Sequence, residues 1–220
     1  MSKVLYEKKD KIAYITLNRP KVNAIDFEMV GELHNIWDDF RDDDNLWVAI
    51  LTGAGNNFSV GFDIREYLQL VREHGFGWRD SSWFGDKNSN PEMHSVWKPI
   101  VTAIDGPANG LGFWLVLASD IKIATPEATF GMAEVRIGAA VEISALLTRY
   151  MPQSIANEIL LTANSITAER AYNCGLINKV VPREQLMTEA TAMANTICEG
   201  GPMAVRVMKQ LVHQGWDLDY

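Results

Sequence analysis

Two glycine-rich segments stand where the chain could stabilise a developing negative charge. GAGNNFSVGFD spans residues 53–63 and GPANGLGF spans residues 106–113; each follows an apolar run typical of a buried strand and precedes a predicted helix. A strand that ends in glycines and feeds a helix points N–H groups at whatever lies over the turn, and the helix dipole adds positive potential there. Two such turns could converge on one oxygen, which is the geometry of an oxyanion hole.

The same glycines allow two other interpretations. Gly53-Ala54-Gly55 after a strand suggests a dinucleotide-binding fingerprint, but the third glycine is missing at the required spacing and the chain contains no GxxxxGK[ST] phosphate loop. The glycines could also serve only tight turns and close helix packing. Spacing alone therefore leaves the oxyanion hole and the purely structural interpretation open.

Strands and helices that could position these turns alternate along the chain. Residues 4–6 and 12–17 flank a charged turn and predict a β-hairpin, and Asp26 is a predicted helix N-cap. The buried face of that helix is expected to carry Phe27, Val30, Leu33, Ile36, Trp37 and Phe40. Further strands are expected at 47–52, 99–105, 121–124 and 178–181. Further helices are expected at 64–71, 114–118 and 143–150, from 154, from 168 to a cap at Gly175, at 184–199 and after Pro202. Residues 73–97 form an aromatic-rich irregular insertion, typical of a mobile or a functional segment.

Composition limits the class of protein. The 220 residues, 47% of them hydrophobic, suffice for one domain with a substantial core. The N-terminus lacks the long apolar stretch of a signal peptide or membrane anchor, so we expect a cytoplasmic protein with no membrane partner. Cys174 and Cys198 stand in no metal-ligand or redox spacing, and we expect no metal. A net charge of -8 argues against nucleic acid as a partner.

Four successive segments carry a family resemblance. They are NRPKVNAID from residue 18, FSVGFD from 58, KPIVTAIDGPANGLGFWLVLASDIKIATPEATFGMAEVRIG from 98, and LTANSITAERAYNCGLINKVVP from 161. In this order they resemble the signature segments of the enoyl-CoA hydratase/isomerase (crotonase) superfamily. The resemblance implies an α/β, ClpP/crotonase-like fold, in which β-β-α repeats form a spiral with two roughly perpendicular sheets, followed by C-terminal helices. It also implies a homotrimer or a dimer of trimers.

The resemblance assigns candidate site residues. The residue after the glycine of FSVGFD would give one oxyanion-hole N–H, and here that residue is Phe62. The middle position of the GGG-like segment would give the other, and here it is Leu111, where the family usually has glycine. The positions that match ligand-lining segments are Lys21, Val22, Ala24, Ser59, Val60, Asp63, Gly110 and Trp114. Asp63 could equally be only an N-cap. The substrate would be an acyl-CoA thioester, so coenzyme A arrives with the substrate and no separate cofactor is implied.

The carboxylates decide which reaction the resemblance implies. Hydratases of the family use two glutamates; only the second is present here, as Glu134, and the first position is Trp114, which cannot act as a base. One base suffices to take a proton from one carbon and return it to another, which favours isomerisation of an enoyl-CoA or dienoyl-CoA. Trp114 would then line an apolar acyl pocket with some of the aromatic residues of the insertion, which are Trp78, Trp83, Phe84 and Trp97.

Glu142 is a second candidate, eight residues beyond Glu134. A carboxylate at this position acts in dienoyl-CoA isomerases and is the nucleophile of 4-chlorobenzoyl-CoA dehalogenase, but the tryptophan that the dehalogenase needs at the position of Glu134 is missing. Glu142 could also be only an exposed carboxylate at a helix start. Two carboxylates in one apolar pocket would have pKa values pushed apart, leaving one as acid and one as base.

Other functions remain open on sequence grounds. The same scaffold could add water to an enoyl-CoA, as hydratases and lyases do, or cleave a C–C or thioester bond with water activated by Glu134, Glu142 or His94. A binding protein, including an RNA-binding type, would need a basic stripe that the acidic chain does not show. Residues 1–200 are expected to form the spiral core, and 201–220 the start of a C-terminal helical region that is truncated relative to the family.

Overall fold

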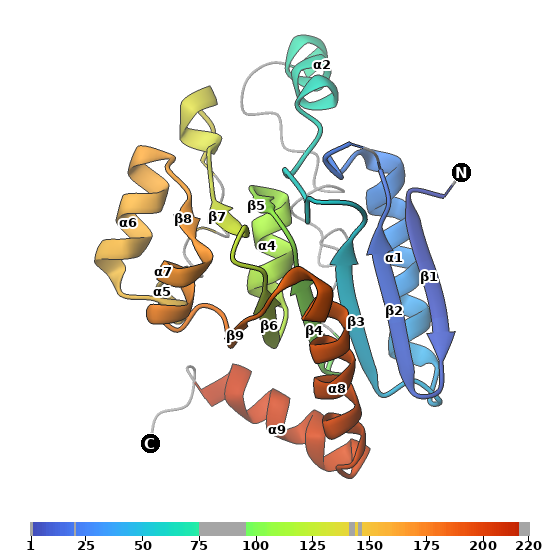
Figure 1. Cartoon of the computed structure of the whole chain (residues 1–220). Coiled ribbons are helices and arrows are strands. Elements are labelled where there is room, and N and C mark those ends of the chain that lie inside the picture. The colour runs from blue at the N-terminus through green and yellow to red at the C-terminus, as the bar shows by residue number, and fades with distance from the viewer. Residues whose placement is uncertain (1, 20, 75–95, 141–143, 145–146, 216–220) are drawn as a thin grey trace.

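A six-stranded, mostly parallel sheet forms the centre of the computed structural model, which describes residues 2–19, 21–74, 96–140, 144 and 147–215 (Figure 1). The strands, in spatial order, are β1 (Val4–Lys9), β2 (Ile12–Leu17), β3 (Val48–Gly53), β4 (Ile100–Ile104), β6 (Ile121–Ala124) and β9 (Lys179–Val180). β1 and β2 form the predicted antiparallel hairpin, and the other neighbours pair in parallel. The carboxyl ends of β3 and β4 therefore lie at one edge of the sheet, and both glycine-rich turns leave from there.

Helices cover both faces of this sheet. Helices α1 (Phe27–Asp42) and α4 (Leu111–Ala118) lie on one face and α8 (Leu186–Cys198) on the other. The other helices that the structure describes are α2 (Ile64–His74), α5 (Leu147–Tyr150), α6 (Gln153–Thr162), α7 (Ala168–Asn173) and α9 (Pro202–Gln214), with 3₁₀ helices η1 (Glu134–Ile137) and η3 (Arg183–Gln185). In β3, Ala49 and Leu51 belong to a core shared with α1 and α4, whereas Val48 and Ile50 pack with α8. Burial on both faces explains why this strand reads as a continuous apolar run.

A second sheet has only three short strands, in the order β5 (Pro107–Asn109), β7 (Thr129–Gly131) and β8 (Ile166–Thr167). β5 and β7 are parallel and pair Asn109 with Gly131, while β8 runs antiparallel to β7. An isolated bridge between Ser59 and Ala108 joins the first glycine-rich turn to β5. The small sheet thus brings the first turn, the second turn and η1 into one neighbourhood.

The C-terminal helix α9 docks at the opposite, amino-terminal edge of the large sheet. Asp120 accepts a hydrogen bond from the Ile100 N–H (2.8 Å), and its carboxylate lies 2.7 Å from Nζ of Lys209 and 3.3 Å from Nε2 of His213. Lys209 also donates to the carbonyl oxygen of Lys98 (3.0 Å). One partly buried carboxylate, just before β6, therefore joins the start of β4 to α9. The exposed apolar side chains of α9 are Met203, Val207, Met208, Leu211 and Val212.

Several sequence-based boundaries need correction. The helix expected at 114–118 begins at Leu111, and the one expected at 64–71 continues to His74. On α1, Met29 is buried, whereas Phe27 and Val30 are only partly so. Of the helix expected at 143–150, the structure describes residue 144 and α5. Within the described residues, no helix combines the length and the apolar character needed to cross a membrane.

Candidate functional site

The two glycine-rich turns lie against each other. The Ser59 N–H donates to the Pro107 carbonyl (3.0 Å), and the Asn109 N–H donates to the Ser59 carbonyl (2.9 Å). Gly61 has φ +96°, and a Cβ on it would lie 2.6 Å from the Asn109 carbonyl oxygen and 3.2 Å from the Leu111 nitrogen. A side chain at Gly61 would therefore push the turns apart, and glycine is what lets the backbones approach so closely.

The two predicted N–H donors emerge beside this contact. The Ile25 N–H donates to the Gly61 carbonyl and the Asp63 N–H donates to the Ile25 carbonyl, both at 2.8 Å. This parallel bridge uses the groups on either side of Phe62, so the N–H of Phe62 points to the side away from Ile25. Leu111 is the first residue of α4, and an N–H in the first helical turn has no acceptor within its own helix. Both donors thus face outward from their own elements.

Glu134 supplies a carboxyl group at the second turn. It begins η1, just after β7, and the pairing of β5 with β7 brings it next to Gly110. A Cβ on Gly110 would lie 2.7 Å from Oε1 of Glu134. Oε2 is buried and has no hydrogen-bond partner among the described residues. Burial raises the pKa of the Glu134 carboxyl, only partly opposed by a hydrogen bond from its own backbone. A carboxyl in this state can accept and hold a proton more readily than an exposed one.

Asn23 and Ser59 hold the first turn in shape. Asn23 is 1% exposed, has φ 49°, and its Nδ2 donates to the carbonyls of Ala54 (2.9 Å) and Asn57 (2.7 Å). The Ser59 hydroxyl donates to the Asn23 carbonyl (2.7 Å) and accepts from the Gly61 N–H (3.1 Å). Ser59, which was expected to line the ligand, is thus fully buried, and its hydroxyl makes its hydrogen bonds within the turn. The sequence reasoning missed Asn23, although asparagine is enriched where φ is positive.

The other predicted residues lie along the loops that lead into the turns. Lys21 and Val22 are exposed, and Ala24 and Val60 are partly buried. The Val60 N–H donates to the Val22 carbonyl (3.1 Å), so these loops run side by side. They offer a surface next to the two donors, and their contact with a ligand stays a prediction.

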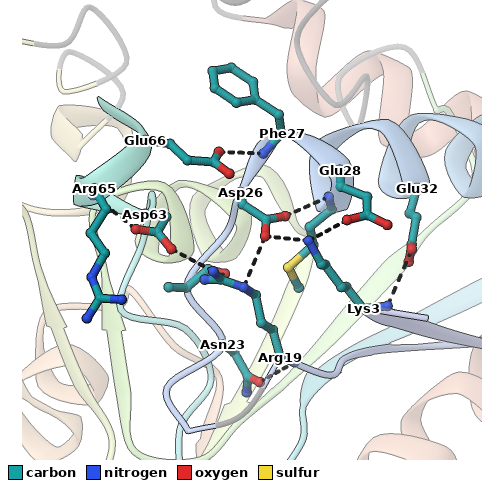
Figure 2. A network of polar contacts seen from close by, with 12 residues as sticks. Lys3, Arg19, Asn23, Asp26, Phe27, Glu28, Glu32, Asp63, Arg65 and Glu66 are labelled. Atoms are coloured by element: carbon teal, nitrogen blue, oxygen red, sulfur yellow. Dashed lines mark hydrogen bonds and ion pairs between the residues drawn. The ribbon is translucent and has the colours of Figure 1, made fainter. Parts of the chain in front are cut away.

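Asp63 is a helix cap, as one of its two interpretations predicted. Its Oδ1 accepts from the Arg65 N–H (3.0 Å) in the first turn of α2, and its Oδ2 accepts from Nη2 of Arg19 (2.7 Å) (Figure 2). Burial opposes ionisation of Asp63, but the hydrogen bonds from Arg19 and the Arg65 N–H outweigh it and lower the pKa. The carboxylate is therefore charged at neutral pH and ties α2 to the loop that carries Arg19.

The aromatic residues expected in an acyl pocket do not all gather there. Trp114 is 1% exposed and belongs to the main core, at the fourth position of α4. Trp97 precedes β4 and contacts the ring of His213 on α9 (centroids 6.2 Å apart), so it lies at the sheet edge opposite the turns and is not part of that pocket. Glu142, Trp78, Trp83, Phe84 and His94 lie outside the described residues. The described residues also include no cluster of His, Cys, Asp or Glu suited to a metal ion.

Comparison with known proteins gives consistent matches over the whole chain. A family model described as Enoyl-CoA hydratase/isomerase matches residues 7–219. The chain is 33% identical to the short-chain-enoyl-CoA hydratase of Clostridium acetobutylicum, covering 100% of this chain and 84% of that protein. It is 34% identical to the (E)-benzylidenesuccinyl-CoA hydratase of Thauera aromatica, covering 98% of this chain and 84% of that protein. The crystal structure of an enoyl-CoA hydratase/isomerase from Mycobacterium paratuberculosis has a TM-score of 0.87 at 31% identity, covering 99% of this chain and 84% of that one. The structural likeness confirms the fold predicted from the sequence.

Proposed function

Because this chain belongs to the enoyl-CoA hydratase/isomerase family, we propose that it binds an acyl-CoA thioester and stabilises the enolate with the N–H groups of Phe62 and Leu111. The observation that carries the proposal is the contact of the two glycine-rich turns beside the carboxyl of Glu134, whose Oε2 is buried. As the enolate forms, negative charge develops on the thioester oxygen. Preorganised N–H donors aimed at this oxygen lower the free-energy barrier to enolate formation by about 3 kcal/mol each. The nearness of the two proposed donors to a proton acceptor supports enolate chemistry at this site.

The reaction that this site suits best is migration of a double bond. Glu134, as a carboxylate, would take a proton from the carbon between the thioester and a 3,4 double bond. The electron pair of that C–H bond moves into the enolate. The protonated Glu134 would then return the proton to the far end of the conjugated system, giving the 2-enoyl-CoA. One carboxyl completes this cycle without water. Trp114 supports this choice, because an indole stands where two-glutamate hydratases have their first carboxylate.

Addition of water to a 2-enoyl-CoA is the second candidate. Two of the similar proteins described above are named as hydratases, which favours this reaction. In this case Glu134 would have to orient the water, remove its proton and protonate the α-carbon in turn. The same oxyanion hole would hold the enolate in both reactions. Isomerisation moves a proton from the α-carbon to the γ-carbon, whereas hydration adds the water oxygen to the β-carbon and a proton to the α-carbon.

Mass spectrometry in labelled water distinguishes these reactions. The protein is incubated separately with a 3-enoyl-CoA, a 2-enoyl-CoA and a dienoyl-CoA in H₂¹⁸O. Isomerisation gives a product of unchanged mass without ¹⁸O, which liquid chromatography separates from its substrate before the mass is read, whereas hydration adds one labelled water to the 2-enoyl-CoA. A Glu134→Gln variant should lose turnover in either reaction, by about 10²-fold to 10⁴-fold. Failure to bind any of the three thioesters would refute the proposed function. The proposed reaction uses no metal or further cofactor, so we expect turnover to survive a chelator.

We also propose that the chain assembles as a homotrimer or a dimer of trimers. The exposed apolar side chains of α9 support self-association, because an apolar face of this kind is typical of surfaces that another protein covers. Light scattering coupled to gel filtration measures the mass directly. A monomeric mass at micromolar concentration would contradict the proposal.

A further inference from the structure

Arg19 lies where the loop before α1 meets the turn that carries Phe62 (Figure 2). Nε of its guanidinium is 3.0 Å from Oδ2 of Asp26, and Nη2 is 2.7 Å from Oδ2 of Asp63. Nη1 donates to the carbonyl of Ala24 at 3.0 Å. The planar guanidinium with its five N–H donors can serve three acceptors in fixed directions, which a lysine ammonium on a flexible stem cannot do.

The two carboxylates that Arg19 contacts are helix caps. Asp26 accepts from the Met29 N–H in the first turn of α1 (3.0 Å), just as Asp63 accepts from the Arg65 N–H in the first turn of α2. Each carboxylate therefore gives one oxygen to its helix and the other to Arg19. Arg19 thereby fixes the N-termini of α1 and α2 relative to each other.

Further contacts connect Phe62 to the N-termini of α1 and α2. The Phe27 N–H at the start of α1 donates to Oε2 of Glu66 on α2 (3.0 Å), and the rings of Phe27 and Phe62 meet edge to face with centroids 5.6 Å apart. Ile25, which pairs with the backbone around Phe62, lies between Ala24 and Asp26 in the chain, and Arg19 binds both of those neighbours. The orientation of the Phe62 peptide thus depends on groups that Arg19 holds.

The two carboxylates depend on Arg19 to different degrees. Asp26 is 2% exposed, and Lys3 also binds it (2.6 Å), so it keeps a cation when Arg19 is lost. Asp63 has no other cation in contact among the described residues. Loss of the guanidinium would therefore release α2 and the end of the first turn more than it releases α1.

We propose that Arg19 is a positioning residue, which joins the caps of α1 and α2 and so sets the direction in which the Phe62 N–H meets the thioester oxygen. This inference rests on the proposed function of the site. Arg19 does not touch the reacting atoms, so its effect should be on the strength of the hydrogen bond to the thioester and on kcat, with little effect on KM.

Infrared difference spectroscopy reads that hydrogen bond directly. The probe is butyryl-CoA with ¹³C at the thioester carbonyl, which binds but has no double bond to move or hydrate. Hydrogen bonding lowers the carbonyl stretching frequency, and the isotope difference isolates this band. Arg19→Lys keeps the charge and Asp63→Asn keeps an acceptor for the Arg65 N–H. The matched control is Arg170→Lys, since Arg170 makes two 2.7 Å contacts with Glu158 on the exposed surface.

In the wild type we expect a shift of the carbonyl band to lower frequency. Arg19→Lys and Asp63→Asn should lose most of this shift and lower kcat about 10-fold to 100-fold, below the full loss of one oxyanion donor. Arg170→Lys should change neither value.

An unchanged carbonyl band in a folded Arg19→Lys protein overturns the inference, even if kcat falls, because a merely structural role would not need the band to move. If Arg19→Lys does not fold, Asp63→Asn decides by the same criterion. A wild type that binds butyryl-CoA with no shift refutes the oxyanion hole itself, and the role of Arg19 falls with it. The proposed function and the inference therefore fail in distinguishable ways.

Discussion

Replacing Gly110 with alanine places a methyl group against the proposed acid/base. The new Cβ would lie 2.7 Å from Oε1 of Glu134, whereas ordinary contact begins at 3.4 Å, so the carboxyl must retreat by about 0.7 Å. The carboxyl is the end of a flexible side chain and moves more easily than the backbone. Misplacement of a catalytic group by about 1 Å can cost about 100-fold in rate. We therefore expect kcat to fall about 100-fold, equivalent to about 2.7 kcal/mol.

Stability should fall as well, for a separate reason. Gly110 has φ 52° and ψ -123°, a backbone conformation that a residue with a Cβ adopts only with strain. Strain of this kind costs about 1–3 kcal/mol, which urea denaturation of the variant should show as a lower free energy of unfolding.

Gly175→Ala separates strain from contact. Gly175 follows α7 with φ +84°, and a Cβ there would meet nothing within 4 Å. This control should lose a similar amount of stability and keep the wild-type kcat in the enoyl-CoA turnover assay. Wild-type kcat in Gly110→Ala, or an equal loss of kcat in both variants, would refute the placement of Glu134 as the proton-transferring group.

Three further changes test the charges and the turn. Burial raises the pKa of Glu134, so its ionised form destabilises the folded protein. At pH 8 the Glu134→Gln variant should therefore unfold at a higher urea concentration than the wild type. The difference should vanish below about pH 4, where the carboxyl is protonated in both the folded and the unfolded protein. Burial opposes ionisation of Asp120, but His213, Lys209 and a backbone N–H outweigh it and lower its pKa. Asp120→Asn should therefore cost about 3–5 kcal/mol at neutral pH, and the cost should shrink as the pH falls below about 4 in guanidinium denaturation; an equal cost at pH 3 would contradict this. Asn23→Ala removes a buried amide that binds several carbonyls and should lower the free energy of unfolding by about 2–3 kcal/mol in thermal melts, whereas a wild-type melting temperature would exclude Asn23 as a support of the turn.

The elements that the sequence predicts well are those with local signals. The β1–β2 hairpin follows from alternation around a charged turn, and α1 follows from the spacing of its apolar residues behind Asp26. The strands of the small sheet have only two or three residues each, too few for any periodicity, so the sequence indicates at most an extended or turn segment from Phe130, where β7 lies, and no strand at β5 or β8. The early start of α4 was hidden by Gly110 and Gly112, which have low helix propensity.

Gly112 illustrates why tertiary contact overrides that propensity. A Cβ on Gly112 would lie 2.6 Å from the Ser59 carbonyl oxygen, so the helix needs glycine there to pack on the first turn. Arg19 and Asn23 reach partners that are 44 and 31 residues away, and no local pattern reveals such contacts. The family resemblance could name Phe62, Leu111 and Glu134, but their supports are visible only in three dimensions.

The position of α9 separates the surface proposed for self-association from the proposed reaction site. Strand β4 leads into the second glycine-rich turn at one end, and at its other end Ile100 binds Asp120, which holds Lys209 of α9. Divergence of the exposed α9 side chains, such as Met203 and Val212, therefore need not disturb the arrangement of the donors. We expect that α9 can be redesigned to change which chains associate, or to attach the enzyme to a support, while the reaction at the far edge stays the same.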